Sequence, residues 1–317
     1  FWALFFVSFL TIFVISNINS NDTFKVRLPA ILDIINKKIL RSPTKFYTCA
    51  EGRRCVFNSS SNKKIFIIGD SHVETLIFNL KDRVIQKNYS FITSTSGGCL
   101  YYPGFNKVQK KTNKISKNCN NKYFSQLEKI LKAQNNSIII FGGRFPKHLT
   151  NYHFDNKEGG VEGGEWEDRY IPTGKFDSIQ SSFRVSLNEL SKKNKIILIY
   201  PIPEAGWHIP RKLLNTLPKD LKKIENYLSQ KKYISTSYSV YKSRTKSSFE
   251  LLDSIQGKNI YRVYPHKLFC DTLIKSRCTT HDEKNIFYSD SNHPSIKGAE
   301  MINNLIINEI KKIENNF

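Results

Sequence analysis

Three residues of this 317-residue chain have the types and the sequence context of a nucleophilic catalytic centre. Ser71 follows an apolar run at 65–68 and a Gly-Asp pair, where a buried strand is expected to end. Asp290 and His293 lie three residues apart near the C-terminus. A serine hydroxyl attacks an acyl group well only when a base takes its proton and a carboxylate orients that base. We therefore predict Ser71 as nucleophile, His293 as base and Asp290 as its orienting residue.

The residues after Ser71 indicate a helix that begins at the serine. Apolar residues recur there at helical spacing, namely Val73, Leu76, Ile77, Leu80 and Val84. Backbone N–H groups at a helix N-terminus are free to donate, and the helix dipole favours negative charge. An oxyanion formed at Ser71 would therefore lie beside donors. The alternative is an ordinary turn with a serine N-cap, and the downstream Asp-x-x-His favours catalysis over it. A second pair, His281 with Asp282, is less favoured because adjacent side chains point to different faces.

Two blocks of the sequence resemble the SGNH hydrolase superfamily. Gly-Asp-Ser-His at 69–72 resembles its first block, and Asp-Ser-Asn-His at 290–293 resembles its last block. The resemblance extends over most of residues 45–312. It is greatest to the extracytoplasmic SGNH domain that is fused to membrane acyltransferases of the acyltransferase-3 type. This branch implies the same triad, with the nucleophile at Ser71.

The middle blocks imply the residues that would bind the oxyanion. Gly98, in Gly-Gly-Cys, is similar to the second block, so the N–H groups of Ser71 and Gly98 are expected to donate. The third block usually carries Gly-x-Asn, and this chain has no Asn there. It has Gly143-Arg144-Phe145, which is similar to the Ala-Arg-Trp of the fused branch. Arg144 is therefore a third candidate for the oxyanion site.

Alternating strand and helix patterns predict an α/β fold. Five apolar runs are separated by helical patterns, at 64–68, 90–95, 137–142, 195–200 and 259–264. Such an order predicts a mostly parallel five-stranded sheet covered on both faces, a three-layer α/β/α sandwich. It is also the SGNH fold that the resemblance implies. A last helix is expected at about 294–312. Ligands of such sheets bind beyond the C-terminal strand ends, where the separate motifs would meet.

The N-terminal residues predict attachment to a membrane. Residues 1–16 are apolar or weakly polar and uncharged, and we interpret them as the C-terminal part of a transmembrane helix. A signal-peptide core is the alternative, but no basic segment precedes the run and no Ala-x-Ala site follows it. Residues 17–60 are expected to form a linker and helical extension, and residues 61–317 the catalytic domain.

Six cysteines fall into three close pairs, which indicates disulfides and an oxidising compartment. Local pairing is preferred but not imposed, and it predicts Cys49–Cys55, Cys99–Cys119 and Cys270–Cys278. Zinc would require shorter Cys-x-x-Cys spacings, and the histidines have no metal-type spacing. No dinucleotide fingerprint or P-loop is present. We therefore expect no metal and no cofactor in this domain.

The formal net charge of +22 limits the partner classes. The basic excess is spread along the chain, which favours compositional bias with a solvated surface. Attraction to anionic glycans or lipid headgroups is the functional alternative. Without a recognisable nucleic-acid module, binding to nucleic acid is not expected.

Two loops are candidates for substrate contact. Residues 153–175 combine clustered glycines, several acids and Trp166, a composition that fits a lid or sugar platform. Residues 201–217 place Trp207 and His208 just past a strand end. A disordered surface loop is the alternative for the first segment. A packing role for the tryptophan is the alternative for the second.

The triad residues predict an enzyme that acts through a serine acyl-enzyme, and the resemblance implies an O-acyltransferase whose acceptor is a hydroxyl of a bacterial envelope glycan, which is lipopolysaccharide, peptidoglycan or exopolysaccharide. By resemblance, a membrane acyltransferase domain of the same full-length chain would deliver acetyl groups from cytoplasmic acetyl-CoA. The SGNH domain would lie on the periplasmic side of the cell membrane. A carbohydrate esterase with water as acceptor is the alternative within enzymes. A catalytically inactive glycan-binding module is disfavoured because all three triad residue types are present. The oligomeric state and the particular glycan stay open.

Overall fold

A six-stranded sheet forms the centre of the protein. The structure, a computed structural model, describes residues 54–163, 167–216 and 232–315 and a few single residues between 216 and 232. The strand order is β1-β3-β2-β5-β7-β9. The five parallel strands coincide with the predicted runs: β2 (Lys64–Gly69), β3 (Ser90–Thr95), β5 (Ile138–Phe141), β7 (Lys195–Ile199) and β9 (Ile260–Val263). The predicted parallel sheet is therefore confirmed.

The sixth strand, β1 (Arg54–Phe57), was not predicted. It pairs antiparallel with β3 at the edge of the sheet. Its segment Arg-Cys-Val-Phe has only three consecutive apolar residues, and in the fold only Cys55 is buried while Val56 is half exposed. An edge strand buries little of its surface, so its sequence carries a weak apolar signal. The sheet thus begins within the segment expected to be linker and extension.

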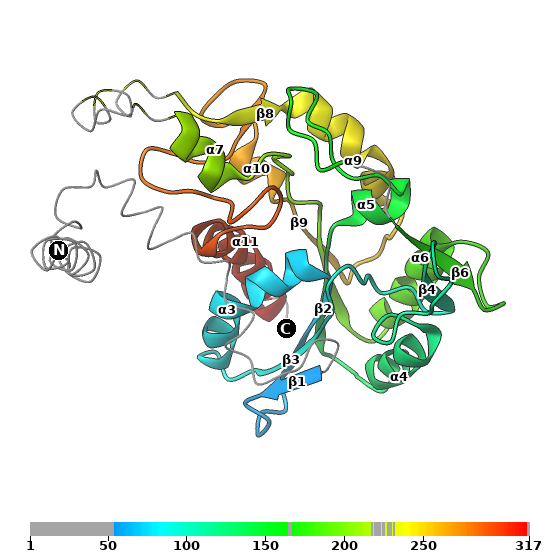
Figure 1. Cartoon of the computed structure of the whole chain (residues 1–317). Helices are drawn as coiled ribbons and strands as arrows, with labels where there is room; N and C mark the ends of the chain where they lie inside the picture. Colours follow the sequence, from blue (N-terminus) through cyan, green and yellow to red (C-terminus); the bar gives the residue numbers. More distant parts are fainter. Residues whose placement is uncertain are drawn as a thin grey trace, which may run out of the picture.

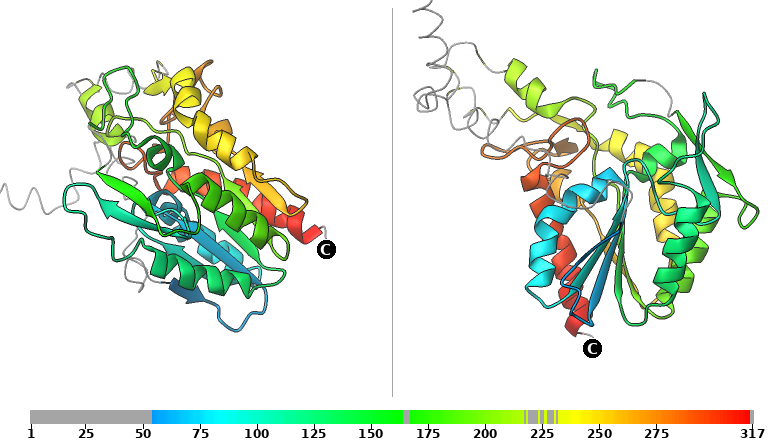
Figure 2. Two further views of the ribbon diagram at one scale, coloured as in Figure 1. Left: turned by 90° about the vertical axis from the view of Figure 1, so that its right-hand side faces the viewer. Right: turned by 60° about the horizontal axis from the view of Figure 1, so that its bottom comes forward.

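Helices cover both faces of the sheet, which confirms the three-layer sandwich. Helices α3 (Ser71–Ile85) and α11 (Ile296–Asn315) lie on one face (Figures 1 and 2). Helices α4 (Asn121–Lys132), α6 (Ile179–Ser191) and α9 (Tyr238–Asp253) lie on the other. Each face has its own buried apolar cluster, with Leu76 and Ile302 in one and Leu127 and Leu187 in the other. The last helix begins two residues later than the start expected at about residue 294.

Smaller elements lie in the segments of the chain that connect the main strands and helices. Two antiparallel pairs join β4 (Phe105–Gln109) to β6 (Asp168–Pro172) and β8 (Ser235–Ser237) to β10 (Arg277–Thr279). Three short helices complete the described part, α5 (Phe145–Thr150), α7 (Ile209–Thr216) and α10 (His266–Phe269). The pairing with β4 fixes one end of the acidic glycine-rich insertion, because β6 belongs to it.

Disulfides join Cys99 to Cys119 and Cys270 to Cys278, which confirms two of the three predicted pairs. Cys55 is also disulfide-bonded, but Cys49 lies outside the described residues, so that pair stays a prediction. The transmembrane segment expected at 1–16 lies outside the described residues as well. In the part of the chain that the structure describes, no helix has the length and apolarity needed to span a bilayer.

Candidate active site

The turn that carries Ser71 is held rigidly between β2 and α3. Asp70 caps the helix, because its Oδ1 accepts the backbone N–H of His72 at 3.0 Å. Gly69 allows β2 and β5 to end side by side, since a Cβ there would lie 2.2 Å from the carbonyl oxygen of Gly142. Ser71 therefore occupies the first turn of a helix with its backbone fixed on both sides.

His293 contacts Ser71 and Asp290 at the same time. Its Nε2 lies 2.8 Å from Ser71 Oγ, and its Nδ1 lies 2.7 Å from Asp290 Oδ2. The other oxygen of Asp290 accepts the backbone N–H of His293 at 2.8 Å. Because a carboxylate only accepts, Nδ1 carries the ring proton and the lone pair of Nε2 faces the serine hydroxyl. These contacts are the ones that the predicted roles of nucleophile, base and orienting residue require, and the roles themselves stay predictions.

Asp290 is ionised in this arrangement. Burial alone would raise the pKa of its carboxyl group, but the hydrogen bond from His293 and the charge of that ring hold the pKa well below its usual range. An ionised Asp290 can stabilise the imidazolium that forms when His293 takes a proton.

A second carboxylate, that of Asp70, connects the turn that carries Ser71 to neighbouring segments. Its Oδ2 accepts the backbone N–H of Arg144 at 2.9 Å and lies 3.4 Å from His148 Nε2. His148 Nδ1 in turn lies 3.1 Å from the hydroxyl of Tyr170, which belongs to β6. Burial would raise the pKa of Asp70, but the His148 hydrogen bond and the charge of His72 lower it well below its usual range. The turn is thus tied to two distant segments.

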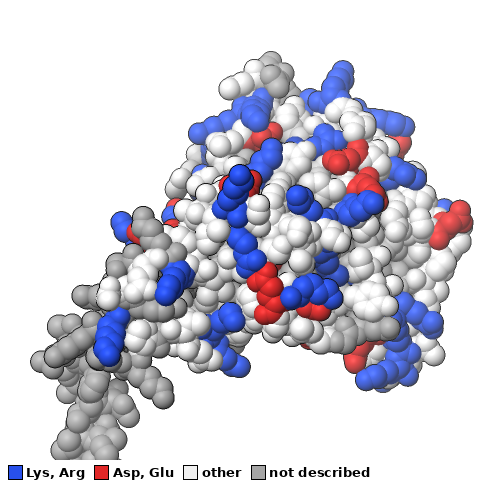
Figure 3. Space-filling view, turned by 90° about the horizontal axis from the view of Figure 1, so that it is seen from above, with Lys and Arg blue, Asp and Glu red and all other residues white. Residues whose placement is uncertain are grey.

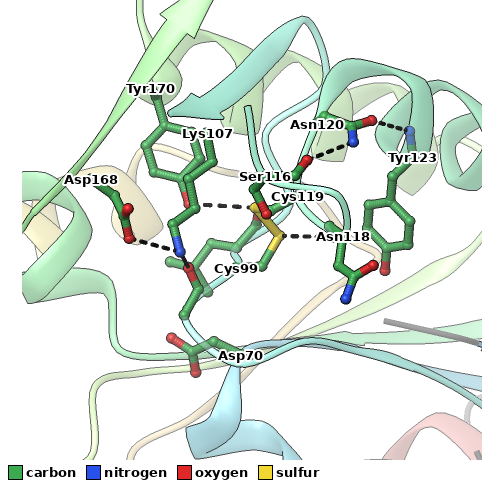
Figure 4. Close-up of a disulfide and its surroundings, with 12 residues drawn as sticks. Asp70, Cys99, Lys107, Ser116, Asn118, Cys119, Asn120, Tyr123, Asp168 and Tyr170 are labelled. Carbon is green, nitrogen blue, oxygen red and sulfur yellow. Dashed lines mark hydrogen bonds and ion pairs between the residues drawn. A yellow bond between two sulfur atoms is a disulfide. The ribbon is translucent and has the colours of Figure 1, made fainter. Parts of the chain in front are cut away.

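Gly98, the second predicted oxyanion donor, has a backbone that is held by a buried lysine. Its φ of +62° lies in the left-handed region that favours glycine. Lys107 Nζ donates to the carbonyl oxygen of Gly98 at 2.9 Å and pairs with Asp168 at 3.0 Å. The neighbouring Cys99 is bonded to Cys119, and Figure 4 shows Lys107 beside this disulfide. The role of Gly98 as a donor stays a prediction.

Arg144 has a different environment from the one expected of an oxyanion donor. Its Nε donates to Glu204 Oε1 at 2.6 Å, and its guanidinium also pairs with Glu162. Burial would lower the pKa of Arg144, but the charges of Glu204 and Glu162 raise it above its ordinary value. Since its backbone N–H is bound by Asp70, we do not retain Arg144 as an oxyanion donor. Both glutamates come from loops, so the sequence offered no signal of this pairing.

The remaining sequence candidates lie in varied surroundings. Trp207 packs partly buried on the core, with Lys212 Nζ 4.0 Å from the ring centroid. His208 is exposed, and Trp166 lies outside the described residues. Their substrate roles stay predictions. His281 Nε2 accepts the backbone N–H of Ile234 at 2.9 Å, so the alternative histidine is occupied elsewhere while His293 contacts Ser71.

The face of the molecule beyond the strand ends carries mixed charge. Lys and Arg side chains are spread over it, and acidic side chains lie among them (Figure 3). This distribution favours the solvated-surface interpretation of the positive net charge. Across the described ranges, no cluster of three or more His, Cys, Asp or Glu residues is placed to hold a metal ion.

A three-layer α/β sandwich with a serine at the strand–helix junction after β2, and Asp-x-x-His before the last helix, is the arrangement of the SGNH type. A family model described as "SGNH domain (fused to AT3 domains)" matches residues 41–308. The chain belongs to this family, whose chemistry is enzymatic acyl transfer.

Two solved structures are similar to the chain. The periplasmic domain of a lipopolysaccharide acetyltransferase from Salmonella ser. Paratyphi A is 19% identical, with 79% of this chain and 84% of that chain covered and a TM-score of 0.47. A possible lipase from Chitinophaga pinensis DSM 2588 is 10% identical, with 79% and 98% covered and a TM-score of 0.33. No curated protein matches the chain.

Proposed function

We propose that this domain transfers an acyl group, most simply acetyl, through an acyl-enzyme at Ser71 to a hydroxyl of a bacterial envelope glycan. The observation that carries the proposal is the continuous chain of contacts from Asp290 through His293 to Ser71, at 2.7 and 2.8 Å. Both distances lie within hydrogen-bond reach, which general-base catalysis requires.

The reaction has two half-steps. In the first, His293 Nε2 takes the proton of Ser71, and Oγ attacks the acyl carbonyl carbon. The tetrahedral intermediate collapses, the bond between the acyl carbon and the leaving group of the donor breaks, and that leaving group receives the proton from His293. In the second, His293 deprotonates the acceptor hydroxyl, which attacks the acyl-serine. The new ester leaves, and the proton returns to Ser71.

The oxyanion of each intermediate would form beside the N-terminus of α3. We assign the backbone N–H groups of Ser71 and Gly98 as its donors. Donors of this kind act in place, because the folded protein has already oriented them. The rigid support of both residues, by Asp70 on one side and by Lys107 on the other, supports this assignment.

The family description supports a membrane acyltransferase part in the same full-length chain. Such a part would carry acetyl groups from cytoplasmic acetyl-CoA to the domain on the extracytoplasmic side. The two disulfides support an oxidising compartment of this kind. The glycan acceptor is the substrate class that the family resemblance implies.

The proposal is tested by mass spectrometry of the chain with 4-nitrophenyl acetate. An acetyl adduct should form on Ser71, and adding envelope glycan should remove it with formation of acetylated glycan. In Ser71→Ala, both the adduct and release of nitrophenol should be lost. Unchanged turnover in that variant would overturn the proposal. Release of acetate alone at saturating glycan would identify an esterase instead.

A further inference from the structure

Glu162, from the acidic glycine-rich insertion, reaches the loop that carries Asp290 and His293. We call residues 289–293 the Asp-His loop. Glu162 Oε1 accepts the hydroxyl of Ser291 at 2.7 Å and the amide Nδ2 of Asn292 at 2.6 Å. The side chain of Glu162 is only 11% exposed. One carboxylate oxygen therefore binds both residues that separate Asp290 from His293.

We propose that Glu162 is a positioning residue, which acts through Ser291 and Asn292 to hold the Asp-His loop in its reactive geometry. This inference rests on the proposed function, because it assigns Glu162 a role in the same acyl transfer. It also changes the interpretation of the insertion. The sequence predicts this segment as a lid or sugar platform, whereas in this inference it supports the base His293 through the loop residues Ser291 and Asn292.

The direction of each hydrogen bond follows from the charge of Glu162. An ionised carboxylate only accepts, so the Ser291 hydroxyl and the Asn292 amide group must both donate to it. The Asn292 carbonyl oxygen then faces the other way, 2.8 Å from His72 Nε2. His72 must therefore carry its proton on Nε2. Glu162 thus sets the amide orientation of Asn292 and, through it, the tautomer of His72.

His72 connects this chain of hydrogen bonds to the base. Its ring lies edge-on to the ring of His293, with centroids 5.1 Å apart. Burial lowers the pKa of His72 to about 4, despite the opposing charge of Asp70. A neutral His72 packs against His293 without adding a second positive charge when His293 becomes protonated. The chain from Glu162 therefore ends at the side of the catalytic ring.

A buried network of charges anchors Glu162 to the scaffold. Arg144, which follows β5, binds Glu162 and Glu204 together. Arg244 on α9 donates to the other oxygen of Glu204 at 3.1 Å. The two positive and two negative charges alternate, so the network balances its own charge. Burial would raise the pKa of Glu162, but Arg144 and the hydrogen bonds lower it to about 2. Glu162 is ionised at every pH at which the enzyme would work.

Hydrogen bonds to backbone carbonyl groups join the insertion, the loop after β7 and the Asp-His loop. Asn156 Nδ2, in the insertion, donates to the carbonyl oxygen of Ala205 at 2.8 Å. The N–H groups of Ala205 and Gly206 both donate to the carbonyl oxygen of Ser291, at 2.8 and 3.0 Å. At Gly206, with φ of +76°, a Cβ would lie 2.4 Å from the carbonyl oxygen of Gly160. The insertion, the loop after β7 and the Asp-His loop therefore pack as one unit.

The first test compares Glu162→Gln with Glu158→Gln. Glutamine at 162 keeps the size of the side chain but cannot accept from all its donors, so the Asp-His loop should lose alignment. Small misplacements of catalytic groups cost up to about 100-fold in rate. We expect kcat for 4-nitrophenyl acetate to fall roughly 10- to 100-fold while KM changes less than about threefold.

Glu158 offers a matched control. It lies in the same insertion, but it binds Arg277 on β10 through two hydrogen bonds of 2.6 and 2.7 Å. Glu158→Gln should keep kcat within about twofold of wild type, because surface ion pairs contribute little. Equal losses in the two variants would show that the insertion matters only for folding and would overturn the inference.

A double-mutant cycle that combines Glu162→Gln with Asn292→Ala tests whether Glu162 acts through Asn292. If Glu162 acts through Asn292, the double variant should be little slower than the slower single variant. Losses that multiply would overturn the inference. Where Glu162→Gln fails to fold, Ser291→Ala removes one donor only and should lower kcat severalfold with KM retained; wild-type kcat in Ser291→Ala would then count against it.

Ser71→Ala, measured in parallel, separates this inference from the proposed function. If Ser71→Ala retains activity, the proposed function fails. If Ser71→Ala is inactive while Glu162→Gln has wild-type kcat and KM, only the role of Glu162 fails.

Discussion

Lys107 Nζ donates a hydrogen bond of 2.9 Å to the carbonyl oxygen of Gly98, the residue whose N–H we assign to the oxyanion. The lysine side chain is only 11% exposed, and Asp168 on β6 balances its charge at 3.0 Å. The conformation of Gly98 is thus fixed from its carbonyl side by a charged group that comes from β4. This links the β4–β6 pair to the proposed oxyanion site.

Replacing Lys107 with methionine should therefore impair catalysis. The variant removes the donor to Gly98, and we expect kcat for 4-nitrophenyl acetate to fall about 10-fold or more, as when an oxyanion group is misplaced. Lys111→Met is the control, since Lys111 is an exposed lysine paired with Glu167 at 3.1 Å. Adding Asp168→Asn should recover stability, measured by urea unfolding, without recovering kcat. An unchanged kcat in Lys107→Met would contradict the assignment of Gly98 as an oxyanion donor.

Ser71 and His293 should behave as one catalytic unit. In the proposed mechanism the serine is activated through Nε2 of His293, so each single alanine variant should lose most of the rate enhancement. The double variant should be little worse than either. Steady-state hydrolysis of an aryl acetate gives the comparison. Activity that survives in His293→Ala but not in His281→Ala would move the base to the alternative histidine.

Asp290→Asn should be damaging but less so than loss of Ser71. The amide that replaces the carboxylate can donate as well as accept, so it no longer imposes a proton on Nδ1 of His293. An analogous substitution in a known triad costs about 10⁴ in kcat. We expect a loss of similar order, with the Ser71 adduct still detectable at long incubation. Full activity would remove Asp290 from the mechanism.

The Cys99–Cys119 disulfide should support the stability of the fold. It closes a loop with a sequence separation of 20 and lies next to Gly98. Replacing both cysteines with serine should lower the free energy of unfolding by about 3 kcal/mol, on a chain-entropy estimate. Peptide mapping without reduction should recover this pair, Cys270–Cys278 and the predicted Cys49–Cys55. A different pairing of Cys49 would correct the sequence prediction.

Mild acid should destabilise the fold through its buried histidines. Burial lowers the pKa of His72 from 6.5 to about 4, so the unfolded chain binds a proton in this range that the folded protein does not. Stability should therefore fall as the pH drops from about 6.5 toward 4, with up to about 1.4 kcal/mol per pH unit from His72. Burial lowers the pKa of His148 and His281 too, which adds to the slope.

Urea unfolding at pH 7, 6 and 5 measures this slope, and His72→Gln isolates one contribution. Glutamine can still donate to Asn292 but does not titrate. The slope of stability against pH in this variant should therefore be smaller, by an amount that corresponds to at most one bound proton. An identical slope in the two proteins would show that His72 is not the group responsible.

Local patterns in the chain were sufficient to predict the sheet and the last helix. The central strands β2, β5 and β7 are buried on both faces, so each is a near-continuous apolar run that can be recognised without knowledge of its neighbours. The outer parallel strands β3 and β9 include Ser, Thr or Arg, and they were predicted from their place between helical patterns. Ser71, Asp290 and His293 could be named because each lies within a short block at a strand or helix boundary. Their meeting follows from the general rule that strand ends of a parallel sheet share one edge.

The tertiary structure alone decided the partners of the charged residues. Glu162 and Glu204 belong to separate loops, and only the packed fold places both against Arg144. Lys107 likewise cannot be distinguished from the many other lysines in the sequence, and only the position of β4 in the fold brings its Nζ to the carbonyl oxygen of Gly98. The antiparallel β1 was hidden for a related reason, since an edge strand buries one residue in four here. Which residues of a strand or helix are buried can be predicted from the spacing of apolar residues within a short segment. Which buried charges pair depends on loops that are brought together only by the completed fold.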